Sequence, residues 1–238
     1  MMSTKPVLTI GVLALQGSFA EHLNTLASVP VISLPFAPQY VLVRTQADLE
    51  LCSALIIPGG ESTTMSLLAT RTGMLEPLRD FVSEGKPVWG TCAGLIWLSS
   101  HIEDGKEGQE KLTIGGLEGV TVRRNRFGRQ RESFMGDVLF TENIFDCLLP
   151  PPTFLSRSGS ATPRTEDPAI KVMARLAGPT PDSEGEIVAV KRDYIFGTSF
   201  HPELTSDKRI HSWWLKEVVG KWLLKQGART PLPGLAPH

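Results

Sequence analysis

The chain has 238 residues, of which 41% are hydrophobic, enough to bury a substantial core. Its 24 Lys and Arg residues nearly balance its 25 Asp and Glu residues, so no overall field would draw it to nucleic acid or to an acidic membrane surface. We expect partners to be recognised locally, with neither nucleic acid nor a membrane among them.

The N-terminal residues 1–15 lack the basic start and cleavage site of a secretory signal, and no apolar run reaches the ~20 residues that span a bilayer. Cys52, Cys92 and Cys147 are odd in number and widely spaced, and they form no Cys-x-x-Cys pair. These features favour a cytoplasmic location with free thiols.

Five short, nearly continuous apolar runs predict strands at 7–15, 54–58, 87–91, 185–192 and 194–200. Runs of this kind are typical of strands that are buried on both faces. We therefore expect an α/β fold in which helices flank a mainly parallel central sheet.

Between and after these strands the pattern changes. Apolar residues three or four apart after Ser62 predict one or two helices, with a break near Gly73 and Pro77. The segment 150–184 is rich in Pro, Gly and Ser and predicts loops. We expect a single domain over residues 1–225 and a disordered tail over 226–238, where no periodic pattern is present.

Cys92 lies in GTCAGL (90–95), where the predicted strand turns into a helix. Small residues suit this turn, because bulky side chains would clash at a sharp elbow. The turn would place Cys92 at the C-terminal edge of the sheet and at a helix N-terminus, where the thiolate is favoured. The alternative is that Cys92 is a small buried apolar residue.

His201 and Glu203 lie in SFHPEL, just after the last predicted strand. On an extended chain residues i and i+2 project to the same side, so Glu203 could hold the imidazole of His201 in one tautomer. Alone, these residues would be interpreted as a surface turn, but together with Cys92 they indicate a nucleophile and its base.

A third motif, IIPGGESTT, occupies residues 56–64. A strand ends at Pro58, and we expect Ser62 to cap the next helix. The Gly-Gly turn between them can point backbone N–H groups at an anion or at a developing oxyanion. It matches neither the dinucleotide fingerprint nor a Walker loop.

The order of PGGES, G-x-C-x-G and HPE resembles the class I (triad) glutamine amidotransferases. More narrowly, the chain is similar to the glutaminase subunits of pyridoxal 5′-phosphate synthases. Five blocks carry this resemblance: GVLALQGSFAEH (11–22), PGGESTTM (58–65), GTCAGLIWL (90–98), RNRFGRQ (124–130) and SFHPELT (199–205).

The resemblance implies a three-layer, flavodoxin-like fold and hydrolysis of L-glutamine to glutamate and ammonia through a cysteine thioester. Cys92 would be the nucleophile, His201 the acid and base, and Glu203 the residue that orients His201. The resemblance implies no metal and no organic cofactor. The ammonia would pass to a separate synthase subunit, in a hetero-oligomer, for vitamin B6 biosynthesis.

The resemblance also assigns residues around the nucleophile. The N–H groups of Gly60 and Ala93 would form the oxyanion hole. A loop with Gln16 and Gly17 would respond to the synthase and help to form that hole; the alternative is a plain strand-to-helix loop. Glutamine would be bound by Gly60, Glu61, Ser62 and Arg124.

One segment departs from the family. Its usual Phe-Ile-Arg-Ala-Pro stretch is replaced here by TFLSRSGSATP (153–163). Either Arg157 no longer reaches glutamine, or the loop takes another route and Arg157 still binds. The arginine-rich run 123–131 could also mark a nucleic-acid patch, but the neutral charge of the chain argues against it.

Two other functions remain open from the sequence. The first is a cysteine hydrolase or peptidase on a similar sheet, against which HPE and PGGES argue. The second is a non-catalytic binding subunit that keeps the fold. The intact Cys92, His201 and Glu203 set disfavours the second function, whereas the altered 153–163 segment leaves it open.

Overall fold

The computed structural model describes residues 5–103, 113–123, 133–141, 153–157, 162–177 and 185–229. Arg124, Cys147 and the segment 230–238 lie outside the described residues. Only the backbone is described for residues 133–135, 153–157, 228 and 229.

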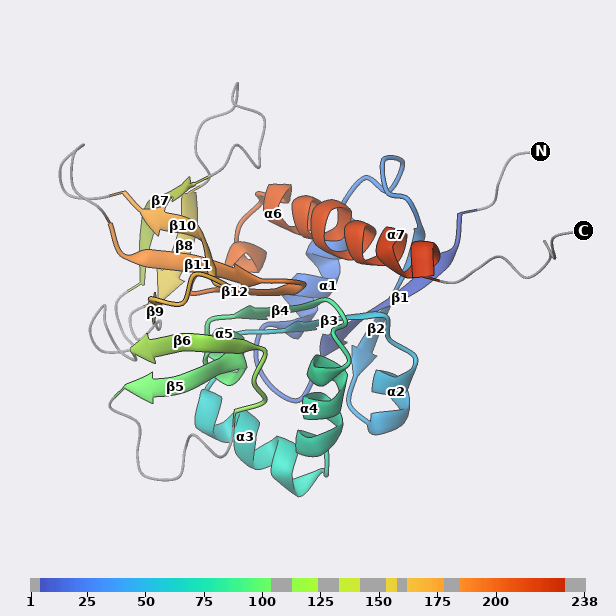
Figure 1. The fold of residues 1–238 in the computed structure, drawn as a ribbon, viewed down its shortest axis with the longest axis horizontal. Helices are drawn as coiled ribbons and strands as arrows, with labels where there is room; N and C mark the ends of the chain where they lie inside the picture. The colour runs from blue at the N-terminus through green and yellow to red at the C-terminus, as the bar shows by residue number, and fades with distance from the viewer. Residues whose placement is uncertain are drawn as a thin grey trace, which may run out of the picture.

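The centre of the molecule is a nine-stranded sheet of order β2-β1-β3-β4-β12-β11-β10-β7-β8 (Figure 1). The pairs from β2 to β12 are parallel, and those from β12 to β8 are antiparallel. In sheet order the strands are Ala37–Val43, Val7–Leu13, Ala54–Ile57, Val88–Thr91, Ile195–Thr198, Ile187–Arg192, Lys171–Leu176, Ser133–Phe140 and Thr153–Arg157.

The expectation of a mainly parallel sheet is corrected, because the sheet is mixed. The reason lies in the connection between β11 and β12, which pair antiparallel with Arg192 opposite Ile195. Only Asp193 and Tyr194 separate the two strands, and Asp193 takes a left-handed φ of 48°. A connection this short makes a hairpin, whereas a parallel pair needs a long crossover.

Helices cover both faces of the sheet (Figure 1). Adjacent strand residues point to opposite faces, as in β3, where Leu55 and Ile57 join one buried apolar cluster and Ile56 joins the other. One face carries α1 (Phe19–Ala27), α6 (Arg209–Trp213), the π-helical η3 (Trp214–Val219) and α7 (Gly220–Arg229); the other carries α2 (Gln46–Glu50), α3 (Ser62–Arg71), α4 (Leu75–Ser83) and α5 (Ala93–Leu98).

The helical segment after residue 62 is two helices, and the predicted break near Gly73 is confirmed. Gly73 separates α3 from α4 with a φ of 72°. Pro77 does not break the chain, because it is the third residue of α4, where a backbone N–H has no partner within the helix.

Two expectations about irregular segments are wrong in part. Within 150–184 the structure has strands β8 and β10 and also β9 (Thr162–Arg164), which pairs with β6 (Leu117–Arg123) in a sheet of order β5-β6-β9. Strand β5 is Ser99–Glu103. Pairing with neighbouring strands offsets the turn-rich composition of this segment.

The expected start of the tail is also corrected, because helix α7 continues to Arg229, four residues beyond 225. Trp222 and Leu223 pack against the core and anchor this helix. No helix in the described ranges is both long enough and apolar enough to cross a bilayer.

Candidate active site

Cys92 sits at the elbow between β4 and α5 with a φ of 49° and a ψ of −101°. Non-glycine residues rarely adopt positive φ, so this backbone is held in place by its surroundings. One restraint is the amide of Cys92, which donates to the carbonyl oxygen of Thr198 at 2.7 Å. The residue is partly exposed to solvent.

The small residues of the elbow are required by close packing, as expected. A Cβ on Gly94 would overlap the carbonyl oxygen of Ile57 in β3. A Cβ on Gly90 would come within 2.5 Å of the carbonyl group of Gly94. The turn therefore requires glycine at both positions, because backbone atoms occupy the space that a Cβ would need.

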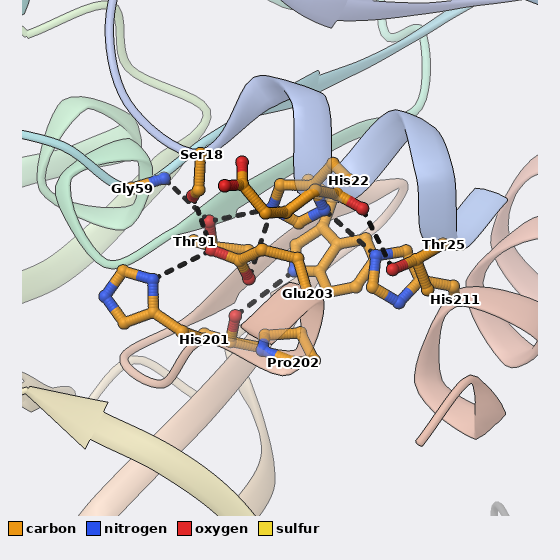
Figure 2. Close-up of polar contacts among 12 residues, drawn as sticks. Ser18, His22, Thr25, Gly59, Thr91, His201, Pro202, Glu203 and His211 are labelled. Carbon is orange, nitrogen blue, oxygen red and sulfur yellow. Dashed lines mark hydrogen bonds and ion pairs between the residues drawn. The ribbon is translucent and has the colours of Figure 1, made fainter. Parts of the chain in front are cut away.

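His201 and Glu203 form a buried hydrogen-bonded pair (Figure 2). Nδ1 of His201 lies 2.8 Å from Oε1 of Glu203. The predicted contact is confirmed, but its backbone is not extended: His201 precedes the short 3-10 helix η2 (Pro202–Leu204), which turns Glu203 back toward the imidazole.

The imidazole of His201 also meets the elbow. A Cβ on Gly59 would overlap the ring of His201 and would lie 3.2 Å from Cβ of Cys92. Gly59 is thus the spacer against which the nucleophile and its base converge. Because Nδ1 is bound to Glu203, Nε2 is the nitrogen of His201 that can exchange a proton with the thiol of Cys92.

The charges of these three residues support one another. Burial alone would lower the pKa of His201, but its interactions with Cys92 and Glu203 raise it to about 10. Burial alone would raise the pKa of Glu203, but the neighbouring imidazoles of His22 and His201 lower it to about 2. The raised pKa of His201 and the lowered pKa of Glu203 favour an imidazolium paired with a carboxylate.

Glu203 has two further partners that the sequence did not identify. The hydroxyl of Ser18 donates to Oε1 at 2.6 Å, and Nε2 of His22 lies 3.3 Å from Oε2 (Figure 2). Both residues belong to the block 11–22, which carries the family resemblance. That block was the available signal, but nothing in its spacing placed it beside Glu203.

The PGGES loop begins α3, and its capping differs from the expectation. Glu61, not Ser62, is the N-cap: its carboxylate accepts from the amides of Thr63 at 3.0 Å and Thr64 at 2.6 Å. Burial opposes the shift, but a 2.6 Å hydrogen bond from the hydroxyl of Thr64, together with these amide bonds, lowers the pKa of Glu61. The longer side chain reaches two N–H groups, and Ser62 becomes the buried first residue of the helix.

The loop with Gln16 and Gly17 lies directly on this turn. Oε1 of Gln16 accepts from the amide of Glu61 at 2.9 Å, and its side chain covers Gly60. Gly17 has a φ of 96°, and a Cβ there would overlap the carbonyl oxygen of Gly59. The structure thus brings Gln16, Gly17 and the Gly-Gly turn together.

The side chains of the two predicted arginines are not among the described atoms. Arg124 lies outside the described residues, and Arg157 is the last residue of β8, where its backbone pairs with Ser133. Cys52 is buried, and burial raises its pKa to about 12, as suits a packing residue. No group of three or more His, Cys, Asp or Glu side chains in the described ranges could hold a metal ion.

Most of the chain is similar to one known protein family. Residues 12–220 match the family model described as the SNO glutamine amidotransferase family. A pyridoxal 5′-phosphate synthase subunit PdxT from Nocardioides sp. is 42% identical over 212 residues, covering 88% of this chain and 94% of the relative. The pyridoxal 5′-phosphate synthase subunit SNO1 from Saccharomyces cerevisiae is 44% identical over 222 residues, covering 92% and 96%.

A solved structure gives the same result. A crystal structure of a glutamine amidotransferase matches with a TM-score of 0.69 and 36% identity. The match covers 89% of this chain and 98% of that one. The similarity therefore extends over the helices and the sheet that position Cys92, His201 and Glu203.

Proposed function

This chain belongs to the SNO glutamine amidotransferase family, and on that basis we propose that it hydrolyses L-glutamine to L-glutamate and ammonia. The observation that carries the proposal is the convergence of a strained, partly exposed Cys92 with the buried pair of His201 and Glu203. A nucleophile, a base and a group that orients the base are the parts that acyl transfer requires.

Cys92 attacks the side-chain carboxamide carbon of glutamine as a thiolate. The N–H groups of Gly60 and Ala93 stabilise the oxyanion that forms, and His201 protonates the departing ammonia. His201 then takes a proton from water, which cleaves the thioester and releases glutamate. Glu203 holds His201 in the required tautomer through both steps.

We assign recognition of the amino-acid end of glutamine to the PGGES loop and the two arginines. Gly60, Glu61 and Ser62 lie beside the elbow, at the start of α3. Arg124 would supply positive charge to the α-carboxylate, for which a guanidinium is well suited. Arg157 would add to that charge if the altered 153–163 segment brings its side chain to the substrate. The assignment of Arg124 rests on the family motif.

The ammonia is delivered to a separate synthase subunit for pyridoxal 5′-phosphate biosynthesis. Two relatives at 42% and 44% identity are named subunits of that synthase, which supports such a partner in a hetero-oligomer. Gln16 and Gly17 are suited to sense the partner, because they contact the turn that carries Gly60. We place the protein in the cytoplasm, with no nucleic acid or membrane among its partners.

We further propose that the chain is one domain, with a sheet whose parallel half is flavodoxin-like. The five parallel strands follow the order β2-β1-β3-β4-β12, which corresponds to the 2-1-3-4-5 order of flavodoxin-like folds. In such sheets ligands bind at the carboxyl ends of the strands, and Cys92 follows the carboxyl end of β4.

A direct assay compares glutamate release from glutamine with cleavage of a general peptide substrate. The proposal predicts release from glutamine only, and covalent labelling of Cys92 by a glutamine-like electrophile. Cleavage of the peptide in preference to glutamine would indicate a cysteine peptidase instead. Labelling of Cys52 or Cys147 with Cys92 untouched would also reject the assignment.

A further inference from the structure

Two fully buried histidines lie beyond Glu203 (Figure 2). His22 comes from α1 and His211 from α6. Nε2 of His22 lies 3.3 Å from Oε2 of Glu203, and Nδ1 of His22 is hydrogen-bonded with Nε2 of His211 at 2.9 Å. A row of close polar contacts thus runs from His201 through Glu203 to two imidazoles that the proposed chemistry does not use.

The carboxylate fixes which nitrogen of each imidazole carries hydrogen. Nε2 of His22 is hydrogen-bonded with the hydroxyl oxygen of Thr91 at 3.2 Å and faces the carboxylate oxygen Oε2 of Glu203 at 3.3 Å. A lone pair on that nitrogen would repel the ionised carboxylate, so Nε2 carries the hydrogen. Nδ1 of a neutral His22 must then accept, and it can do so only from the Nε2–H of His211.

The surroundings keep both imidazoles neutral. Burial lowers the pKa of His22, although the charge of Glu203 opposes this shift, and burial lowers the pKa of His211 well below its ordinary value. The titratable groups that face His22 are Glu203 and His201 from the turn after β12, His211 from α6, and Glu21 from α1 itself.

The two rings are also fixed in orientation. Trp89 of β4 packs edge-on against both of them, with ring centroids 5.6 Å from His22 and 4.7 Å from His211. Nδ1 of His211 is buried without a hydrogen-bond partner among the described atoms. A buried polar atom left unpaired is costly, which argues that another requirement holds this imidazole in place.

We propose that His22 is a positioning residue for Glu203, and that His211 sets the tautomer in which His22 acts. Oε1 of Glu203 is hydrogen-bonded by His201 and Ser18, whereas Oε2 is buried without a hydrogen bond of its own among the described atoms, and Nε2 of His22 faces it at 3.3 Å. Without that imidazole the buried charge on Oε2 would lose this close polar contact, and the carboxylate would turn or take up a proton. Its hold on the imidazolium of His201 would weaken in either case.

This inference deepens the proposed function, and its test needs neither glutamine nor the synthase. The ultraviolet absorbance of the Cys92 thiolate is titrated against pH in the full chain. Subtraction of the same titration with Cys92→Ala removes the signals of the other two cysteines. The thiol pKa reports how well His201 is held as an imidazolium, a property that a merely structural role of His22 would leave unchanged.

His22→Leu should raise the pKa of the Cys92 thiol by about one unit or more, because a polar contact at 3.3 Å from the buried carboxylate of Glu203 is lost. His22→Gln is the matched control: its amide offers an N–H to Glu203 and an oxygen to His211, and should restore most of the shift. An unchanged thiol pKa in His22→Leu would overturn the proposal. So would an equal shift in His22→Gln, since shape rather than the donor would then matter.

A second variant covers the case in which His22→Leu does not fold. His211→Phe keeps the ring packing against Trp89 and leaves His22 in place, but removes the donor to its Nδ1. The thiol pKa should rise in the same direction by a smaller amount. No rise in a folded His211→Phe protein would contradict the role of His211. The titration uses no glutamine, so it stays interpretable even if the chain does not hydrolyse glutamine. The positioning role of His22 and the proposed glutaminase activity are therefore tested separately.

Discussion

The amide of Cys92 donates to the carbonyl oxygen of Thr198, and this bond joins the strand that carries the nucleophile to the strand that carries its base. Thr198 ends β12 and pairs in parallel register with Thr91, the last residue of β4. Both strands therefore reach the same edge of the sheet together. His201 follows three residues later, which explains how residues more than a hundred positions apart meet.

The three central residues should act as one unit. Cys92→Ala and His201→Asn should each remove nearly all glutamine hydrolysis, and their combination should be hardly worse than either, since such losses are not additive. Glu203→Gln should cost less, about 10-fold to 100-fold in kcat, or about 1.4–2.8 kcal/mol, because orientation is only partly lost. Steady-state kinetics with circular dichroism as a folding control would check this. A double variant far worse than either single variant would contradict the shared role.

Gly94 should be intolerant of alanine. Its Cβ would overlap the carbonyl oxygen of Ile57, which belongs to a buried strand and cannot move freely, so Gly94→Ala should destabilise the protein by about 1–3 kcal/mol. Gly227 in α7 is the matched control, because a Cβ there meets nothing. Gly227→Ala should stabilise by about 0.5–1 kcal/mol through helix propensity. Equal effects of the two variants in urea unfolding would refute the packing argument at the elbow.

The sequence was most informative where local patterns decide the structure. Strands β1, β3 and β4 were predicted from their apolar runs, and the elbow at Cys92 from its small residues, because burial on both faces and close backbone approach restrict the residues allowed. The contact between His201 and Glu203 was also predicted, although through the wrong backbone geometry.

The sequence was least informative where pairing between distant segments decides. Strand β2 contains Pro38 and lies at the sheet edge, and β10 sits among turn-forming residues, so neither shows a strong strand pattern. Ser18 and His22 were missed as partners of Glu203 for the same reason. They are more than 180 positions from Glu203, and only the packing of α1 against η2 brings them together.

The stability of the protein should depend on the charge of Glu203. Its pKa falls from an ordinary 4.5 to about 2 in the folded protein, so the charged form stabilises the fold above pH 4.5. This contribution should be lost progressively as the pH falls from 4.5 toward 2. Glu203→Gln has no such group to titrate. The difference in free energy of unfolding between the two proteins should therefore shrink over this window, and a constant difference would be inconsistent with a depressed pKa.

Arg124 should be needed for glutamine binding. A charge-assisted hydrogen bond to the α-carboxylate is worth roughly 1.5–3 kcal/mol, so Arg124→Ala should raise the KM for glutamine by about 10-fold to 100-fold. Arg157→Ala should raise it similarly if the altered 153–163 segment still brings that side chain to the substrate. A KM unchanged in Arg157→Ala alone removes Arg157 from the site, and a KM insensitive to Arg124→Ala overturns the assignment of the carboxylate contact.

The central claim is that this chain is a glutaminase. Its Cys92 is the nucleophile that releases ammonia from glutamine, and the ammonia passes to a synthase. The most direct measurement is glutamate release from glutamine by the purified chain, with and without a cognate synthase subunit and with Cys92→Ala as the blank. The account predicts weak release alone, strong stimulation by the synthase, and none from Cys92→Ala in either condition. Absence of glutamate in both conditions, or release that survives Cys92→Ala, would contradict it.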